Sequence, residues 1–319
     1  MTRPFLAFLH STLDSTRLVR HGLILVLAAV SSSGCSVRQL AIGQVTEMVE
    51  AGIPAFEEDD ELDLVEKSIP ANIKLLEALL VSDPTNERLM TLLARLYGSY
   101  AFAFVDGRYE LAAARNDPAK DELKARMNTY YKRGMEYATR ALVFKKPVCA
   151  AELKKAETAG NCFNRLSRDE LAALFWLAFN KAAYVNRNLS DLKALADASV
   201  IEKAMQRVIA IDEGFFFGSA NFFLMVYYGG RPKMAGGDVV KAEEYFKRGK
   251  RIAGDSFLLG DLLFARFVLV QKQDRSSFHQ ILTRVASDKS EAGGGFRLYN
   301  QMARTRARIY LTQETDLFD

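Results

Sequence analysis

Apolar residues recur every three or four positions along most of the chain, and this spacing places them on one face of an α-helix. The stretch 226–251 shows the pattern clearly. There, two Gly-Gly pairs at 229–230 and 236–237 interrupt an apolar helix, and Asp238 has the side chain expected of an N-cap for the next helix. This stretch therefore predicts a helix-turn-helix unit.

The same kind of unit recurs. In the second helix, Ala242 and Phe246 match the A-x-x-x-F spacing of a tetratricopeptide repeat. The further expected helix pairs are 86–104 with 131–142, 169–184 with 200–211, and 257–271 with 276–286. We predict an all-α, tetratricopeptide-like superhelix of about four irregular helix pairs with capping helices.

The segments around these pairs are less regular. We expect a short helix at 36–56, an amphipathic helix at 69–81, and a partly helical insertion at 105–124. The acidic run 57–61 is interpreted as a solvated first turn rather than a cation site. After a flexible turn at 293–295, the helix 296–311 is expected to cover the last exposed apolar face.

The amino terminus carries a targeting signal. Arg17 and Arg20 precede the apolar run 23–30, which is too short for the ~20 residues of a membrane-spanning helix. Gly34-Cys35 resembles a bacterial lipobox, in which the cysteine is cleaved free and acylated. We therefore predict a lipoprotein signal peptide at 1–34 and a single helical domain at 35–319. Cys35 would be the lipid anchor, and a plain secretory cut nearby is the alternative.

The lipobox resemblance also bears on location. Ser36, rather than Asp, follows the cysteine, and in proteobacterial lipoproteins this favours the outer membrane. The predicted location is the periplasmic face of the outer membrane.

Two cysteines remain in the predicted mature chain. Cys149 and Cys162 lie thirteen positions apart, and in an oxidising periplasm they could close a small disulfide loop. Two reduced, partly buried thiols are the alternative. The neighbourhood offers too few further ligands for a metal site, so none is predicted.

The sequence gives little sign of catalysis. His279 is the one histidine after residue 34, and no nucleophile-elbow, zinc-protease or phosphate-loop motif occurs. We predict neither an enzyme nor a cofactor; a hydrolase built around His279 and nearby carboxylates is the alternative. The net charge of +4 is too small for a nucleic-acid-binding surface.

Aromatic residues are concentrated in two of the predicted first helices. A helix buries only a stripe of its surface, so part of this apolar area is expected to form a groove for a ligand or partner, although ordinary interhelical core is the alternative. The repeat geometry assigns this concave face to the following residues: Thr91, Arg95, Phe175, Phe179, Phe222 and Val226.

These stretches together resemble a known family. The chain is similar to the T component (TatT) family associated with tripartite ATP-independent periplasmic (TRAP) transporters. The Arg-Pro-x-x-x-Gly-Gly-Asp turn at 231–238 is the most specific match. The other matching stretches are 56–86, 92–104, 173–184 and 306–318.

The resemblance implies a lipid-anchored periplasmic protein that associates with the solute-binding protein of such a transporter. It also implies a homo-oligomeric ring, with a trimer favoured, and an apolar cleft or pore for an apolar or amphiphilic organic acid. The rival function is a general outer-membrane lipoprotein scaffold for envelope protein assembly, since a helical-repeat fold does not fix function.

Overall fold

The computed structural model describes residues 37–289 and 295–318, and every regular element in these ranges is helical. The prediction of an all-α fold is confirmed. The chain divides into two units, 1–50 and 51–319. Of the first unit, the described residues 37–50 are helical. The predicted signal peptide, Cys35, and the glycines at 293 and 294 lie outside the described residues.

The second unit contains long helices joined by short ones. Its elements are α2 (Pro54–Glu57), α3 (Leu62–Ser82), α4 (Glu87–Tyr100), η1 (Ala101–Val105), α5 (Asp106–Ala114), α6 (Ala119–Lys145), α7 (Cys149–Glu152), α8 (Ala156–Asn164), η2 (Arg168–Glu170), α9 (Leu171–Arg187), α10 (Leu192–Ala196), α11 (Ala198–Asp212), α12 (Phe215–Gly229), η3 (Lys233–Ala235), α13 (Val239–Ala253), α14 (Leu258–Phe264), η4 (Ala265–Leu269), α15 (Arg275–Ser287), α16 (Arg297–Thr312) and α17 (Glu314–Leu317).

No helix in the described part of the chain has both the length and the apolar composition needed to cross a bilayer.

Side-chain caps set several helix starts. The side chain of Asn86 accepts a hydrogen bond from the Leu89 backbone N–H at 3.0 Å, and Asp238 accepts one from Lys241 N–H at 3.0 Å. Each cap satisfies a backbone donor that has no partner inside the helix. The predicted starts of α4 and α13 are confirmed.

Two expectations at the amino-terminal end were wrong. Helix α3 begins at Leu62 rather than near 69, with Pro70 inside it. The acidic run before it is not simply solvated: Glu57 pairs with Arg95 and accepts a hydrogen bond from the Tyr299 hydroxyl at 2.7 Å. These partners are distant in sequence, so local charge pattern alone could not indicate them.

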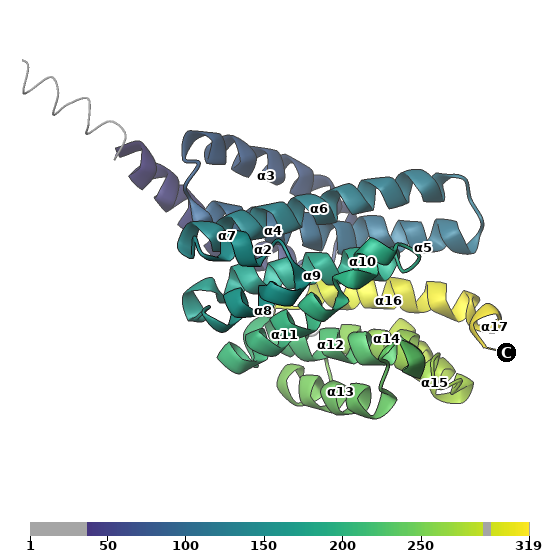
Figure 1. Ribbon diagram of the computed structural model, residues 1–319. Helices are drawn as coiled ribbons and strands as arrows, with labels where there is room; N and C mark the ends of the chain where they lie inside the picture. Colours follow the sequence, from purple (N-terminus) through teal and green to yellow (C-terminus); the bar gives the residue numbers. More distant parts are fainter. Residues whose placement is uncertain (1–36, 290–294, 319) are drawn as a thin grey trace, which may run out of the picture. The chain divides into compact units, whose positions relative to one another are not determined.

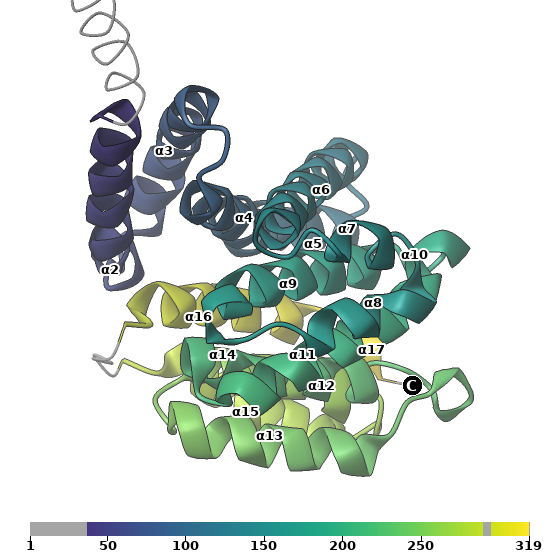
Figure 2. The ribbon, with the colours of Figure 1, turned by 60° about the vertical axis from the view of Figure 1, so that its left-hand side comes forward.

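The predicted helix pairs correspond to α4 with α6, α9 with α11, α12 with α13, and α14 with α15, and the members of each pair pack together. Both views show α16, in yellow, between α9 on one side and α12 and α14 on the other (Figures 1 and 2). The terminal helix therefore covers α14 and α15, as expected, and also enters the space between the early and late helices. The superhelical, tetratricopeptide-like arrangement stays a prediction.

A buried asparagine marks a close crossing of three helices. Asn180 of α9 is fully buried and donates hydrogen bonds to the carbonyls of Ala94 (3.1 Å) and Trp176 (2.7 Å). A Cβ added at Gly98 of α4 would lie 2.6 Å from the Asn180 amide, and one at Gly134 of α6 would overlap it. Glycine at these positions therefore lets three helices meet around one amide group.

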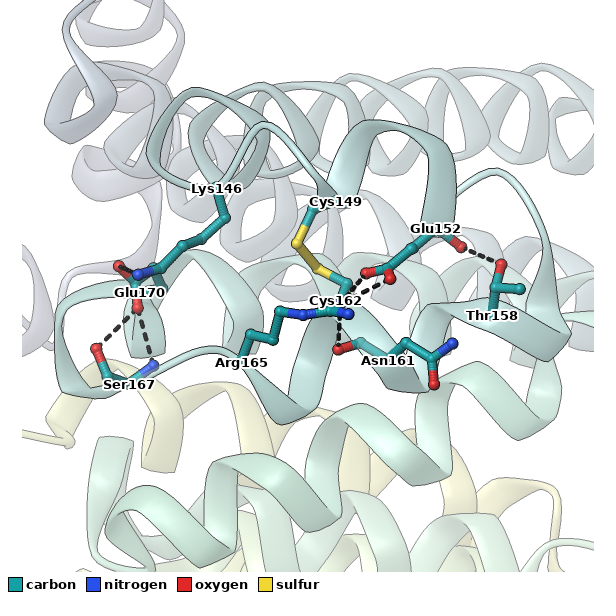
Figure 3. Close-up of a disulfide and its surroundings, with 9 residues drawn as sticks. All are labelled: Lys146, Cys149, Glu152, Thr158, Asn161, Cys162, Arg165, Ser167 and Glu170. Atoms are coloured by element: carbon teal, nitrogen blue, oxygen red, sulfur yellow. Dashed lines mark hydrogen bonds and ion pairs between the residues drawn. A yellow bond between two sulfur atoms is a disulfide. The ribbon is translucent and has the colours of Figure 1, made fainter.

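The two late cysteines form a disulfide in the structure. Cys149 of α7 is bonded to Cys162 of α8, and both are fully buried (Figure 3). Arg165 and Glu152 form an ion pair beside it, and the Ser167–Glu170 capping box follows (Figure 3). The disulfide thus closes a short two-helix loop between α6 and α9, where sequence periodicity predicted no helix.

A buried ion-pair quartet joins three helices. Asp106 and Glu110 of α5 contact Arg187 of α9, with 2.6 Å between Arg187 Nε and Asp106 Oδ1. The same two carboxylates contact Arg306 of α16, at 3.3 Å and 3.2 Å. Burial would raise the pKa of Glu110, but Arg187 and Arg306 outweigh it and hold that pKa at about 2. The quartet fixes the last long helix against the first half of the unit.

We expect Gly134→Ala to lower the free energy of unfolding by about 1–3 kcal/mol, because the new methyl group overlaps the Asn180 amide. In an Asn180→Ala background the same change should cost much less, since the space is then open. Urea unfolding of the four proteins measures this coupling. Gly52→Ala is the control, because no atom lies within 4 Å of its added Cβ. Equal costs of Gly134→Ala in both backgrounds would contradict the proposed crossing.

Replacing Arg306 with Gln should lower the free energy of unfolding at pH 7 by about 3–5 kcal/mol, because two buried carboxylates then share one arginine. The lowered pKa of Glu110 means that its contribution is complete above the unfolded pKa of ~4.3 and is lost as the pH falls through about 2. The variant should lose part of this acid sensitivity, as the Glu110 pKa moves back toward its usual value.

Urea unfolding between pH 7 and pH 3 tests this expectation. Arg308→Gln is the matched control on the same helix, since Arg308 is exposed and should change stability by less than ~0.5 kcal/mol. If both variants had the same stability and the same pH dependence, the quartet would not have the role assigned to it.

Candidate functional site

A cavity of about 120 Å³ lies among α9, α12, α14, η4 and α16. Its size is close to that of an engineered cavity of ~150 Å³ that binds benzene. Most of its wall is apolar, and many of the lining side chains are aromatic. The aromatic lining residues are Phe102, Phe179, Phe216, Phe217, Phe222, Phe223, Tyr227, Phe257, Phe267, Tyr299 and Tyr310. The cavity therefore has room for a compact apolar group and walls that suit it.

Irregular backbone brings several of these rings to the cavity. Phe102 lies in the π-helical segment η1, and Phe267 lies in the second π-helical segment, η4. Such segments inside α-helices occur frequently at functional sites.

The start of α12 is irregular as well. Phe216 and Phe217 have φ angles of 47° and 60°, followed by Gly218 at 67°. A left-handed conformation costs a bulky residue about 1–3 kcal/mol, and such strain gathers at binding sites. Both phenylalanines line the cavity, so three separate departures from regular helix meet at one place.

One wall of the cavity is polar. Asp106, Arg187 and Arg306 of the buried quartet reach it. Arg306 is only 2% exposed and its Cζ lies 4.8 Å from the centre of the Phe102 ring. Its Nε and Nη2 atoms are near carboxylates but are not aligned for hydrogen bonds with any described residue. With two arginines and two carboxylates, the quartet is neutral overall.

The cavity reaches residues that are accessible to solvent where the end of α9 meets the turn after α12. Leu189 lines it and is 49% exposed, and the half-buried Arg231 lines it from the turn. The guanidinium Cζ of Arg231 lies 3.9 Å above the centre of the Tyr227 ring. This edge combines an apolar surface with one cation.

Three of the six predicted groove residues line the cavity: Phe179, Phe222 and Val226. Phe222 is also core, because it packs against Gly249 and Gly260, where an added Cβ would lie 2.8 Å and 2.6 Å from its ring. That these residues contact a ligand or partner stays a prediction.

The other three do not line this cavity. Burial contradicts the assignment of Phe175 to an accessible groove, whereas a contact of Thr91 or Arg95 with a partner stays a prediction. Phe175 is fully buried among aromatic rings, because α9 has helices packed around it rather than one free face. The Thr91 hydroxyl donates to the Glu87 carbonyl at 2.8 Å. Arg95 pairs with Glu57 and lies over Trp176.

Sequence reasoning missed the polar wall and the rings of the π-helical segments. Phe102 belongs to the stretch AFAF, whose two phenylalanines are only a weak indication of a binding site. Arg187 and Arg306 look like ordinary charged helix residues in the sequence, and their partners on α5 lie far away along the chain. Nothing local marks them as cavity residues.

The other residues considered for catalysis or metal binding lie outside the cavity. His279 is exposed, and its Nδ1 is 2.7 Å from Glu314, which also binds Arg275. Neither His279 nor Glu314 lines the cavity. Cys149, Cys162 and Glu152 lie close enough to hold a metal ion, but the two sulfurs are bonded to each other and Glu152 is paired with Arg165. The absence of catalysis stays a prediction.

Comparison with known proteins places this chain in a family. An uncharacterised protein of Treponema pallidum (strain Nichols) is 25% identical over 304 residues, which cover 90% of this chain and 94% of the relative. The family model of the TRAP transporter T-component matches residues 58–318, a range that contains every helix from α3 to α17. The resemblance in the 231–238 turn is thus part of a match along the whole second unit, and the chain belongs to the TRAP transporter T-component family.

Proposed function

We propose that this accessory component of a TRAP transport system holds an apolar or amphiphilic organic acid in its aromatic cavity and associates with the periplasmic solute-binding protein. The cavity is the observation that carries the proposal. It is lined by rings from η1, α9, α12, the N-cap of α14, η4 and α16, so its shape depends on most of the second unit.

The energetics support a binding role. The left-handed backbone of Phe216 and Phe217 costs stability, and strain of this kind clusters at ligand sites. Both side chains line the cavity, which supports a ligand site there.

The remaining parts of the proposal concern location and assembly. Cys35 would be acylated and would hold the protein at the periplasmic face of the outer membrane. The chain would assemble as a homo-oligomer, with a trimer favoured. A periplasmic, oxidising location agrees with the Cys149–Cys162 disulfide, because such bonds persist in that environment.

Filling the cavity should abolish ligand binding. We expect Val226→Trp, at a half-buried wall position, to weaken binding of 4-phenylbutyrate by at least tenfold, measured by isothermal titration calorimetry. Val240→Trp makes the same exchange at a position of α13 that is 69% exposed, and it should bind like the wild type. Thermal unfolding establishes that both variants are folded. Unchanged binding by a folded Val226→Trp protein would place the ligand elsewhere.

The partnership predicts that affinity purification from detergent-solubilised envelopes of the native host recovers a solute-binding protein. If no solute-binding protein were recovered, and deletion of the gene instead lowered outer-membrane protein levels, the envelope-scaffold function would replace the proposed one.

The proposed lipid anchor predicts that a strain producing the Cys35→Ser variant releases the protein from the membrane fraction.

A further inference from the structure

We infer that Arg231 binds the carboxylate of the ligand at the solvent-accessible edge of the cavity, so that the acid lies with its apolar part inside and its head group at the surface. The inference rests on the proposed function, and it assigns to that function a specificity-determining residue and an orientation of the ligand.

The charges on the cavity wall single out Arg231. Three arginines line the cavity: Arg187, Arg231 and Arg306. The first and third are neutralised by Asp106 and Glu110 in the closed quartet. Among the described residues, no carboxylate forms a direct ion pair with Arg231; its contacts are the ring of Tyr227 and a hydrogen bond with the Tyr227 side chain. Arg231 is therefore the lining cation whose charge an acidic ligand would balance.

The neighbouring carboxylate, Glu202, already has a hydrogen-bond partner. Glu202 of α11 accepts a hydrogen bond from the Tyr228 hydroxyl. Lys241 donates to that same hydroxyl at 2.6 Å and lies 4.0 Å from the centre of the Tyr228 ring. The Tyr228 hydroxyl thus links Glu202 to Lys241, and Glu202 also hydrogen-bonds the Tyr227 side chain. The turn 229–238 itself carries Arg231 and Lys233 against Asp238, a net charge of +1.

The position of Arg231 suits a carboxylate. Its guanidinium lies over the Tyr227 face at 3.9 Å, and Tyr227 itself lines the cavity. A guanidinium has five N–H donors, so the hydrogen bond with Tyr227 leaves others at its edges that can form two parallel hydrogen bonds with a carboxylate. Arg231 can therefore contact an aromatic wall and an anion at once.

The glycine-rich turn holds Arg231 in this position. A Cβ at Gly237 would overlap the Arg231 carbonyl, and a Cβ at Gly230 would lie 3.1 Å from the Phe267 ring. The Asp238 N–H donates to the Tyr228 carbonyl at 2.9 Å and closes the turn. The glycines let the chain fold back so tightly that the arginine stays beside the end of α12.

A structural role for Arg231 makes a different prediction. The residue follows the carboxyl end of α12 at Gly229, where a cation stabilises a helix by about 0.3–1 kcal/mol. That effect would be the same for a charged and an uncharged ligand. Discrimination between an acid and its neutral analogue therefore separates the two roles.

The test uses two probes of the same shape, 4-phenylbutyrate and 4-phenylbutanamide, with affinities measured by titration calorimetry on the full mature protein. The wild type should prefer the acid by about tenfold or more, which corresponds to at least ~1.4 kcal/mol. Arg231→Gln should lose this preference by weakening acid binding while leaving amide binding unchanged. Arg231→Lys should retain part of it, and Lys233→Gln, an exposed cation in the same turn, should match the wild type.

Each other result contradicts the inference. A preference for the acid that survives in folded Arg231→Gln would assign the head group to Arg187 and Arg306 instead. Equal affinities of the wild type for both probes, or equal weakening of both by Arg231→Gln, would reduce Arg231 to a structural residue while the proposed ligand site stands. Failure of the folded wild type to bind either probe would contradict the proposed function itself and this inference with it.

Discussion

The ion-pair quartet of Asp106, Glu110, Arg187 and Arg306 is the constraint on which the second unit depends. Each charge would be costly to bury alone, because removal from water costs several kcal/mol that a partner must offset. Together the four groups neutralise one another and join α5, α9 and α16. Helices far apart in the sequence are therefore fixed at the positions where their rings form the cavity wall.

This arrangement also explains why the cavity does not simply collapse. The rings around it meet edge to face or tilted, as Phe179 with Phe223 and Phe216 with Tyr299 do. Such contacts are favourable at ring separations of about 4.5–7 Å and give the wall a definite shape. The helices are joined by ion pairs and the rings are rigid, so together they keep the cavity open. Flexible aliphatic side chains at the same positions would fill it.

The sequence was informative where structure is local. The caps at Asn86 and Asp238 and the periodicity of the long helices gave the all-α fold and the helix pairs. The early start of α3 was missed because Pro70 resembles a helix boundary, although the helix accommodates it at an interior position.

The candidate site was only half predictable. Phe179, Phe222 and Val226 follow from helical spacing, but Phe175 does not, because spacing cannot tell how many neighbours will surround a helix. The π-helical segments that present Phe102 and Phe267, and the pairing of Arg306 with Asp106, depend on contacts between distant parts of the chain. Such contacts leave no local pattern.

The placement of α16 has a consequence for how the protein is made. A chain that leaves a ribosome or crosses a membrane from its amino terminus exposes α5 long before α16 has emerged. Until then Asp106 and Glu110 lack one of their two arginines, and Tyr299 and Tyr310 are missing from the cavity wall. The cavity thus has its complete wall only when the end of the chain arrives, so a prematurely terminated protein lacks it.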